Sequence, residues 1–256
     1  MSTGEPLAVV VPALNEAHPG GLRATLEALH AQEDDDFDLV VVDNGSTDGT
    51  GDVARAAAAE WGRGRWRVVD EPVKGTGAAA DTGMRAAIAG GAVLLARTDA
   101  DCLPPPTWTR DVRRAFASGD ELVAGRLVPR TDDRPVSGFQ QGALAAALAV
   151  ASAFGKVRPG NRDDGYLGPY VMTPGCNMAI TAALYEAAGG FPRTRIEDLH
   201  EDRALVNAVR RITTRYGAHP EVWVLASTRR VHAWGLLRTL GWYADHRYRP
   251  EMVDIR

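Results

Sequence analysis

Short, almost entirely apolar runs alternate with helix-like segments along the first part of the chain, and this alternation constrains the fold more than any other feature. The apolar runs are residues 7–11, 39–42, 66–69 and 92–96. Runs of this length, bounded by polar turns, are typical of strands buried on both faces of a parallel sheet. Three helix-like segments separate them, residues 21–31, 51–61 and 77–89. We therefore expect an α/β fold with a doubly wound, mostly parallel central sheet and helices on both faces.

The second half of the chain is less regular. We expect helices over four segments, residues 107–118, 181–189, 199–211 and 234–246. Two further strands are expected, at residues 121–128 and 222–225, and residues 158–170 have the Gly, Pro, Asp and Asn content of a loop. Because neither an internal repeat nor a linker is visible, we expect residues 1–256 to form a single domain.

Composition and charge narrow the class of protein. The net charge is −4, so no basic field suggests a nucleic-acid partner. Two cysteines, Cys102 and Cys176, cannot build a disulfide framework and suggest a reducing compartment. The N-terminus lacks the features of a signal peptide, and the longest apolar stretch, residues 142–155, is shorter than the roughly 20 residues that a membrane span requires. We expect a cytoplasmic protein without a transmembrane segment, with residues 142–155 forming a buried helix.

Polar residues directly follow each of the four apolar runs. These polar segments are residues 12–16, 43–49, 70–77 and 98–101. Sheets of this kind bind ligands outside the carboxyl ends of their strands, where the connecting loops gather. The sequence therefore predicts a ligand site built from these four segments.

Two carboxylates, Asp99 and Asp101, flank a single residue at the end of the fourth run. Such a pair can hold a hard divalent cation against a diphosphate. Acidic pairs are also common in ordinary turns, and that reading stays open. The preceding apolar run and the prolines that follow, residues 104–106, favour a metal site.

The second and third polar segments each have two readings. Asp43 could accept a hydrogen bond from a nucleotide base, while the residues after it could serve as a turn and helix cap, with Gly45 at positive φ. Lys74 and Gly77 open a predicted helix whose backbone N–H groups favour an anion, although a solvated turn would look the same. Lys74 is of interest because it is one of only two lysines in an arginine-rich chain. The segment is neither a Walker A loop nor a Rossmann fingerprint.

Taken together, these segments resemble the inverting glycosyltransferases of family 2, which have the GT-A fold. The motifs that carry the resemblance are PALNE (12–16), VVDNGSTDGT (41–50), KGTGAAADTGMRAA (74–87), TDADCLPP (98–105), PGCNMAI (174–180), GGF (189–191) and EDRAL (201–205). They follow the family's order and span roughly residues 7 to 211. The resemblance implies a single GT-A domain in which residues of about 1–105 bind a nucleotide sugar and residues of about 106–256 bind the acceptor.

The same resemblance assigns roles to individual residues. The donor-binding residues would be Pro12, Asn15, Glu16, Asp43, Ser46, Lys74, Gly77 and Asp99. Asp101 would bind a divalent metal ion, Mn²⁺ or Mg²⁺, and His232 is a candidate further ligand, although a lone histidine can equally be structural or solvated. Arg229 and Arg230 could meet the diphosphate, or could be surface charges.

On the acceptor side the resemblance points to the Glu201–Asp202 pair as the source of the catalytic base, with Asp202 the preferred choice. The nearby Glu197 and Asp198 leave the register of this motif open. Asn177 would bind the acceptor, or would instead be a buried amide that stabilises its own loop. Neither cysteine is given a catalytic role.

The implied function is metal-assisted transfer of a sugar from a UDP- or GDP-linked donor to an acceptor hydroxyl, with inversion. Two alternatives remain at this stage: a sugar nucleotidyltransferase, and a catalytically silent nucleotide-sugar-binding protein of the same fold. The first would be expected to carry a Gly- and Arg-rich loop where residues 12–16 stand, and the second to lack Asp101 or the Glu201–Asp202 pair. The acceptor is not identified; if it is a lipid, peripheral contact with a membrane is expected.

Overall fold

The computed structural model describes residues 4–62, 64–130, 142, 159–193, 200–235 and 238. The strands are β1 (Leu7–Ala13), β2 (Phe37–Asp43), β3 (Trp66–Asp70), β4 (Leu94–Thr98), β5 (Leu122–Pro129), β6 (Asn177–Thr181) and β7 (Tyr216–Ala226). The helices are α1 (Leu22–His30), α2 (Thr50–Trp61), α3 (Thr76–Ala89), α4 (Trp108–Ala117), α6 (Ala182–Ala187), α7 (Glu201–Val209) and α8 (Arg229–Trp234), with a 3₁₀ turn at Pro159–Asn161. None of the described helices is long and apolar enough to cross a lipid bilayer.

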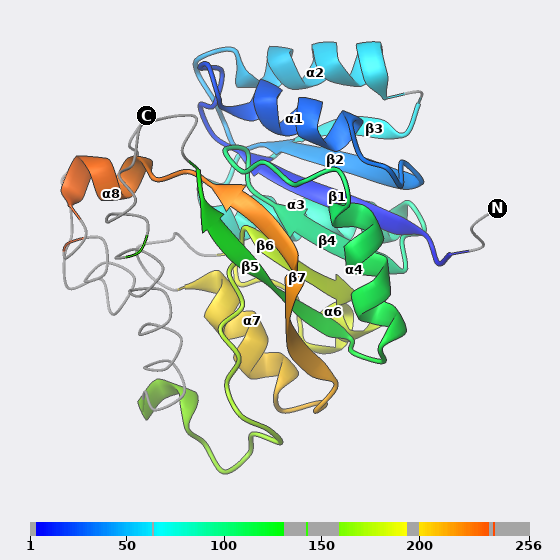
Figure 1. The fold of residues 1–256 in the computed structure, drawn as a ribbon, viewed down its shortest axis with the longest axis vertical. Helices are drawn as coiled ribbons and strands as arrows, with labels where there is room; N and C mark the ends of the chain where they lie inside the picture. The colour runs from blue at the N-terminus through cyan, green and yellow to red at the C-terminus, as the bar shows by residue number, and fades with distance from the viewer. Residues whose placement is uncertain are drawn as a thin grey trace.

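All seven strands belong to one sheet, in the order β3-β2-β1-β4-β6-β5-β7 (Figure 1). Strands β3, β2, β1 and β4 are parallel neighbours, and β5 pairs in parallel with β7. Strand β6 lies between β4 and β5 and is antiparallel to both. Strands from both halves of the chain therefore share one sheet, and the carboxyl ends of β1, β2, β3 and β4 meet at one edge of it.

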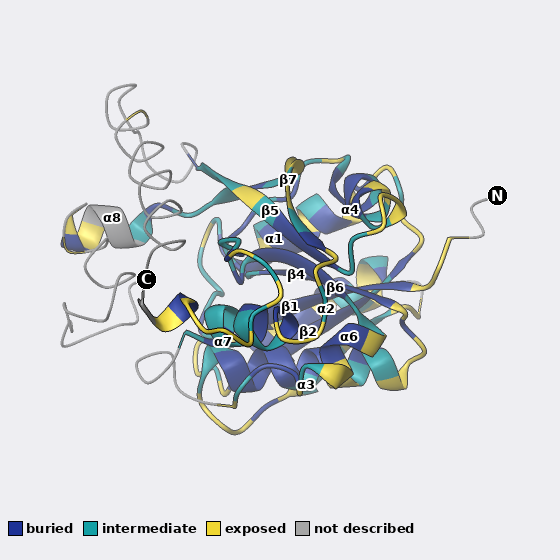
Figure 2. Cartoon of the chain, turned by 90° about the horizontal axis from the view of Figure 1, so that it is seen from below, coloured by how far each residue is buried: buried dark blue, intermediate teal, exposed yellow. Residues whose placement is uncertain are grey.

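Helices cover both faces of the sheet, and strand β1 shows how the sequence produces the two cores. Leu7, Val9 and Val11 point into the core formed with α1, α2 and α4. Ala8 and Val10 point into the core formed with α3, α6 and α7. Figure 2 shows the buried strands enclosed between these two layers of helices. A strand that is buried on both faces must be apolar at every position, which is why β1 appears as a continuous run. The predicted fold class is confirmed.

The structure corrects several element boundaries. Strand β4 begins at Leu94, two residues later than expected, and β7 begins at Tyr216 rather than at residue 222. After Tyr216, the first half of β7 is half-buried or exposed and contains Gly and Pro, which explains why its apolar signal was weak. Strand β6 was not predicted as a strand at all. Most of the helices expected at residues 142–155 and 234–246, together with Glu197 and Asp198, lie outside the described residues.

Candidate active site

The loop after β1 is fastened to the loop after β2. The backbone N–H groups of residues 15, 16 and 17 donate hydrogen bonds to side-chain oxygens of Ser46, Thr50 and Asp48, at 2.9, 2.7 and 3.0 Å. In return the Asn15 Oδ1 atom accepts a bond from the backbone N–H of residue 47, at 2.6 Å. Asn15 has a positive φ of 52°, a conformation that asparagine adopts more readily than most residues. Four hydrogen bonds thus fix the relative position of the two loops.

Asp43 is the last residue of strand β2 and Asn44 follows it, and their side chains make different contacts. Asp43 is half-buried, and its Oδ1 atom accepts a bond from the backbone N–H of Ser46 at 3.0 Å. Gly45 between them has a φ of 75°, as predicted. Asn44 is buried, and its Oδ1 atom accepts a bond from the backbone N–H of Gly75 at 2.9 Å. Asn44, which sequence reasoning did not single out, therefore ties the second loop to the third.

The third loop places Lys74 and Gly77 in different surroundings. Lys74 is exposed, whereas Gly77 is buried in the first turn of α3. A side-chain Cβ atom at Gly77 would lie 2.2 Å from the backbone oxygen of Pro192 and 3.3 Å from the Cβ atom of Glu201. Only glycine allows this close approach, so Gly77 is the point where Pro192 and the start of α7 pack on α3. Pro12, within β1, is buried beside Val42 of β2.

Arg229, in the first turn of α8, lies between two of the predicted donor-site carboxylates. Its Nη2 atom is 2.7 Å from Glu16 Oε1 and 2.7 Å from Asp101 Oδ2. Its Nη1 atom is 2.6 Å from the Nε2 atom of His18. Burial raises the pKa of Glu16, and the charge of Asp101 raises it further, while the bond from Arg229 partly offsets both. Glu16 and Asp101 thus converge on one positive group.

This convergence bears on whether a divalent cation fits. Carboxylate oxygens are the ligands that hard divalent cations prefer, and the guanidinium of Arg229 shows that the position stabilises positive charge. The backbone oxygen of Asp101 accepts a bond from Arg130 at 2.9 Å, which fixes its loop. Across the described residues there is no group of three or more His, Cys, Asp or Glu side chains that could hold a metal ion. The carboxylate oxygens of Asp101 are chemically suited to a divalent cation, and among the described side chains Asp101 would supply only part of such an ion's ligands. His232 lies in α8, but its side chain is outside the described residues.

Arg97 in β4 is the most informative residue of the site that was not predicted from the sequence. Its side chain is buried, with 1% exposed, and its Nη1 and Nη2 atoms each lie 3.2 Å from Glu201 Oε1. On the other side, its Nε and Nη2 atoms lie 3.3 Å from Asp99 Oδ1. The one sequence signal was a charged residue directly after the apolar run of strand β4, Leu94–Thr98. Arg97 joins the loop after β4 to the start of helix α7.

Glu201 and Asp202 begin helix α7 in unlike environments. Glu201 is buried and bonded to Arg97, whereas Asp202 is half-buried. Asp202 accepts hydrogen bonds from the backbone N–H groups of Gly175 at 3.2 Å and Arg203 at 2.6 Å. Burial raises the pKa of both carboxyl groups. For Glu201 the charge of Arg97 is the main opposing influence; for Asp202 it is the bond from the Arg203 N–H, followed by the charge of Arg97.

Asn177 lies at the start of β6, and its side chain is fully buried. Its Oδ1 atom accepts a bond from the indole N–H of Trp108 at 3.0 Å. Its Nδ2 atom donates to the backbone oxygens of Arg126 and Val222 at 2.9 and 3.0 Å, beside the register shift between Gly125 and Arg126 where β5 pairs with β7. This geometry favours the structural reading of Asn177 over contact with an acceptor.

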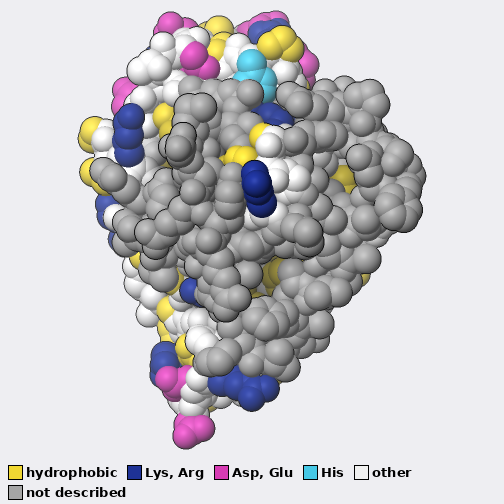
Figure 3. Space-filling model, turned by 90° about the vertical axis from the view of Figure 1, so that its left-hand side faces the viewer, with side chains coloured by type: hydrophobic (Ala, Val, Ile, Leu, Met, Phe, Trp, Pro, Cys, Tyr) yellow, Lys and Arg dark blue, Asp and Glu magenta, His cyan; other side chains and the backbone are white. Residues whose placement is uncertain are grey.

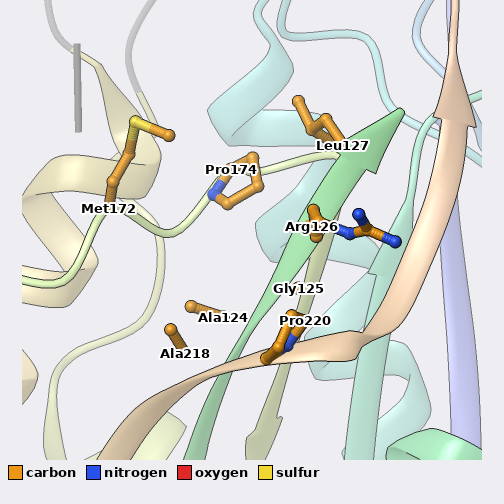
Figure 4. A pocket seen from close by; sticks show the side chains of 8 residues that line it. All are labelled: Ala124, Gly125, Arg126, Leu127, Met172, Pro174, Ala218 and Pro220. Atoms are coloured by element: carbon orange, nitrogen blue, oxygen red, sulfur yellow. The ribbon is translucent and has the colours of Figure 1, made fainter. Parts of the chain in front are cut away.

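An open, mainly apolar hollow of about 290 Å³ adjoins this register shift (Figure 4). Its lining comes from β5, β7 and the loop before β6: Ala124, Gly125, Arg126, Leu127, Met172, Pro174, Ala218 and Pro220. The residue after Pro174 is Gly175, which donates to Asp202. The hollow therefore adjoins the loop that donates a hydrogen bond to Asp202.

Figure 3 views the molecule from the edge where the parallel strands end. Where described side chains reach this surface, Lys and Arg are scattered among acidic, apolar and other side chains, without a continuous basic patch. Beneath the surface, Arg97 and Arg229 are each paired with two carboxylates.

Comparisons with known proteins identify the family of the chain. Residues 8–179 match the family model described as Glycosyl transferase family 2. Glycosyltransferase AglE of Haloferax volcanii is 33% identical over 124 residues, which make up 47% of this chain and 39% of AglE. The present chain thus matches well under half the length of that curated relative.

Solved structures show the same fold. The mannosyltransferase PcManGT of Pyrobaculum calidifontis, in complex with GDP-Man and Mn²⁺, has a TM-score of 0.66 at 24% identity, covering 95% of this chain and 64% of that one. Glucosyl-3-phosphoglycerate synthase of Mycobacterium tuberculosis, in complex with Mn²⁺, UDP and glucosyl-3-phosphoglycerate, has a TM-score of 0.56 at 18% identity, covering 91% and 75%. TarS of S. aureus in complex with UDP-GlcNAc has a TM-score of 0.62 at 16% identity, covering 88% and 59%.

The chain therefore belongs to glycosyl transferase family 2, a family of enzymes, and its fold is of the GT-A type. The family predicted from the sequence motifs is confirmed.

Proposed function

We propose that this protein transfers a sugar from a nucleoside diphosphate sugar to an acceptor hydroxyl group, with inversion at the anomeric carbon. The observation that carries the proposal is the meeting of Asp99 and Glu201 on the guanidinium of Arg97. This contact brings the donor-side loop after β4 next to the helix that begins with Glu201 and Asp202. An inverting transfer needs such an arrangement, with the leaving group on one side of the sugar and a base on the other.

In this proposal the fastened loops after β1 and β2 receive the nucleotide. Asp43 would accept a hydrogen bond from the base, and the segment of residues 12–16, with Ser46 behind it, would line the pocket. Lys74, exposed beside the N-terminus of α3, and Gly77 would lie near the ribose and diphosphate, and Asp99 near the ribose or sugar. Residues of about 1–105 would form the donor half and the remainder the acceptor half.

Asp101 would hold a divalent cation, Mn²⁺ or Mg²⁺, together with the diphosphate, and His232 is a candidate further ligand. When bound, such a cation supplies positive charge that stabilises the departing diphosphate. Arg229, already beside Asp101, would turn its guanidinium toward the phosphate oxygens, for which its fork of N–H donors is well suited.

Asp202 would act as the general base. Glu201 is buried and already bonded to Arg97, whereas Asp202 is partly accessible. A carboxylate has about four lone-pair positions, so the two N–H bonds to Asp202 leave room for an acceptor hydroxyl. Asp202 would take the hydroxyl proton as the oxygen bonds to the anomeric carbon, while the bond to the diphosphate oxygen breaks and its electron pair leaves with the diphosphate.

A ligand panel followed by product analysis tests this function. Nucleoside diphosphates and nucleotide sugars, with UDP and GDP series in parallel, are added with and without Mn²⁺ or Mg²⁺ while thermal unfolding is measured. A specific donor should raise the unfolding midpoint in proportion to the logarithm of its concentration. Transfer releases a nucleoside diphosphate, whereas a nucleotidyltransferase would form or consume pyrophosphate. No stabilisation by any nucleotide would contradict the proposal, and pyrophosphate chemistry would replace it.

A further inference from the structure

Arg97 occupies a place that a charged residue rarely takes, inside a central strand whose other described positions are buried. Strand β4 reads Leu-Leu-Ala-Arg-Thr, and all five residues are buried. Burial alone would lower the pKa of Arg97, but the charges of Asp99, Glu201 and Asp202 outweigh it and raise the pKa instead. An arginine stays protonated even when it is this deeply buried, and the carboxylates around it offset the cost of burying its charge.

The surroundings hold the guanidinium in one place. The ring of Phe191 lies with its centroid 5.2 Å from the Arg97 Cζ atom, a cation–π contact. On another side, a Cβ atom at Gly175 would come within 3.2 to 3.4 Å of the guanidinium, so the missing side chain lets this loop approach. The same Gly175 donates its backbone N–H to Asp202. The guanidinium, its aromatic neighbour and the loop that binds Asp202 therefore form one packed unit.

We propose that Arg97 is a positioning residue for the catalytic base. By binding Glu201, Arg97 fixes the first turn of α7 and keeps the neighbouring Asp202 turned toward the acceptor side; by binding Asp99, it holds that turn against the donor loop. The inference rests on the proposed function, because it concerns the same site and its base. Arg97 would contact neither substrate. Its bond to Glu201 would leave Asp202 as the carboxylate that acts as the general base.

The charges facing Asp202 give this role a measurable signature. Asp202 is faced by Arg97 from β4, by the N–H of Gly175 from the loop before β6, and by Glu201 and Arg203 from its own helix. Arg97 lowers the pKa of both Glu201 and Asp202 against the effect of burial. Loss of its charge should therefore raise the pKa of Asp202, so that the base becomes protonated at a higher pH.

Three variants test the proposal: Arg97→Gln, which removes the charge, Arg97→Lys, which keeps it, and Arg210→Gln as a matched control. Arg210 is also buried and ends helix α7, where it bonds to the backbone oxygen of Gly168. Arg97→Gln should lower kcat about 100-fold, as expected for a misplaced catalytic group, with the donor KM changed by less than about threefold. The acid limb of its kcat/KM profile should move to higher pH. Arg97→Lys should recover most of the rate and the normal acid limb, and Arg210→Gln should leave both unchanged.

A second measurement does not depend on activity. The carboxyl carbons of Asp202 and Glu201 can be titrated by ¹³C NMR, with Asp202→Asn and Glu201→Gln used for assignment. The Asp202 titration should move upward in Arg97→Gln and stay near the wild-type position in Arg97→Lys. If Arg97→Gln does not fold, Arg97→Lys and the double variant Arg97→Gln/Glu201→Gln, which removes both members of the ion pair, carry the test.

The outcomes separate the inference from the function. Unchanged kcat and an unchanged Asp202 titration in folded Arg97→Gln would overturn the positioning role while the proposed transfer stands. An equal loss of rate in Arg97→Gln and Arg210→Gln, without a shift of the acid limb, would also overturn it, because that pattern is merely structural. A wild-type protein that binds no nucleotide and transfers no sugar would instead overturn the proposed function.

Discussion

The loops after β1 and β2 and the Glu201–Asp202 pair are held in place in different ways. The loops after β1 and β2 are held by hydrogen bonds between backbone N–H groups and short polar side chains such as Ser46 and Asp48, near the surface. The Glu201–Asp202 pair is held by a buried guanidinium from β4, more than 100 positions earlier in the chain. The first kind of support joins two loops that are 31 positions apart in the chain. The second joins a strand and a helix that are 104 positions apart, and its disruption should lower the transfer rate without weakening nucleotide binding.

The largest effect that this comparison predicts is at the base itself. Asp202→Asn should lower kcat by about three orders of magnitude, the range for loss of a general base, while nucleotide binding is retained. Steady-state transfer and a nucleotide thermal-shift titration measure the two properties. Asp111→Asn is the matched control, since Asp111 also lies in the first turn of a helix, α4, but has no part in the proposed reaction. Transfer by Asp202→Asn at the rate of the control would assign the base to another carboxylate.

The next largest effect is expected at Asp101, on the donor side. Asp101→Asn should lower kcat/KM by about 100-fold or more, because part of the charge stabilisation of the leaving group is lost. It should also abolish the additional thermal stabilisation that Mn²⁺ gives to a nucleotide complex. Asp52→Asn, at an exposed carboxylate in the first turn of α2, is the control. A variant that keeps its metal-dependent stabilisation would contradict the assignment of Asp101.

The raised pKa of Asp202 should make the transfer rate and the stability of the fold depend on pH in opposite directions. Burial raises the pKa of Asp202 above its ordinary value of 3.8, so transfer should be lost as the pH falls through this raised pKa. Stability follows the opposite sign: the folded state binds this proton more tightly than the unfolded state, so its contribution is present at low pH and is lost as the pH rises through the raised pKa. At neutral pH Asp202→Asn should therefore unfold at a higher temperature than the wild type. A lower midpoint would show that the charge of Asp202 stabilises the fold.

The parts of the protein that were predictable from sequence are those set by local patterns. Strand β1 is apolar at every position because it is buried on both faces, and Gly45 marks a turn because its φ is positive. The segment of β6 is only five residues long and antiparallel, and no local signal distinguishes it from a loop. Arg97 could not be assigned a partner, because Glu201 comes near it only after both halves have joined one sheet.

Asn177 illustrates the same limit within a motif. Its position in PGCNMAI suggested contact with an acceptor, but the side chain is bonded to Trp108, Arg126 and Val222 inside the fold. The residues that determine this outcome lie in α4, β5 and β7. The motif alone therefore left two roles open for Asn177. Its contacts in the folded chain favour a structural role over binding of an acceptor.

A smaller effect on transfer is expected at Asn177, because its side chain stabilises the fold. Asn177→Leu leaves the Trp108 indole N–H and two backbone oxygens without their bonds, and should lower the free energy of unfolding by about 3 kcal/mol. The transfer rate per folded molecule should stay within about threefold of the wild type, because the lost bonds stabilise the fold and do not contact substrate. Chemical denaturation and active-fraction measurements test the two statements. If Asn177→Leu instead raised the acceptor KM and left the stability unchanged, Asn177 would be assigned to acceptor binding.

The smallest predicted effect is at the loop contacts of the donor side. Ser46→Ala removes one bond to the Asn15 N–H and should weaken nucleotide binding by about fivefold, equivalent to roughly 1 kcal/mol. Calorimetric titration of the nucleotide measures this change. Ser118→Ala removes a comparable serine bond at the end of α4 and should leave binding unchanged. Equal weakening by both substitutions would mean that the contact of Ser46 is not specific to the donor pocket.

The fastening of residues 15–17 by the second loop also has a thermodynamic consequence. A loop that is loosely held in the free protein must give up conformational entropy when a ligand orders it, and that loss is subtracted from the affinity. Here Asn15 already has its left-handed backbone conformation and the neighbouring N–H groups are already bonded. The loop is therefore preorganised, and its binding of a nucleotide should carry only a small conformational-entropy penalty.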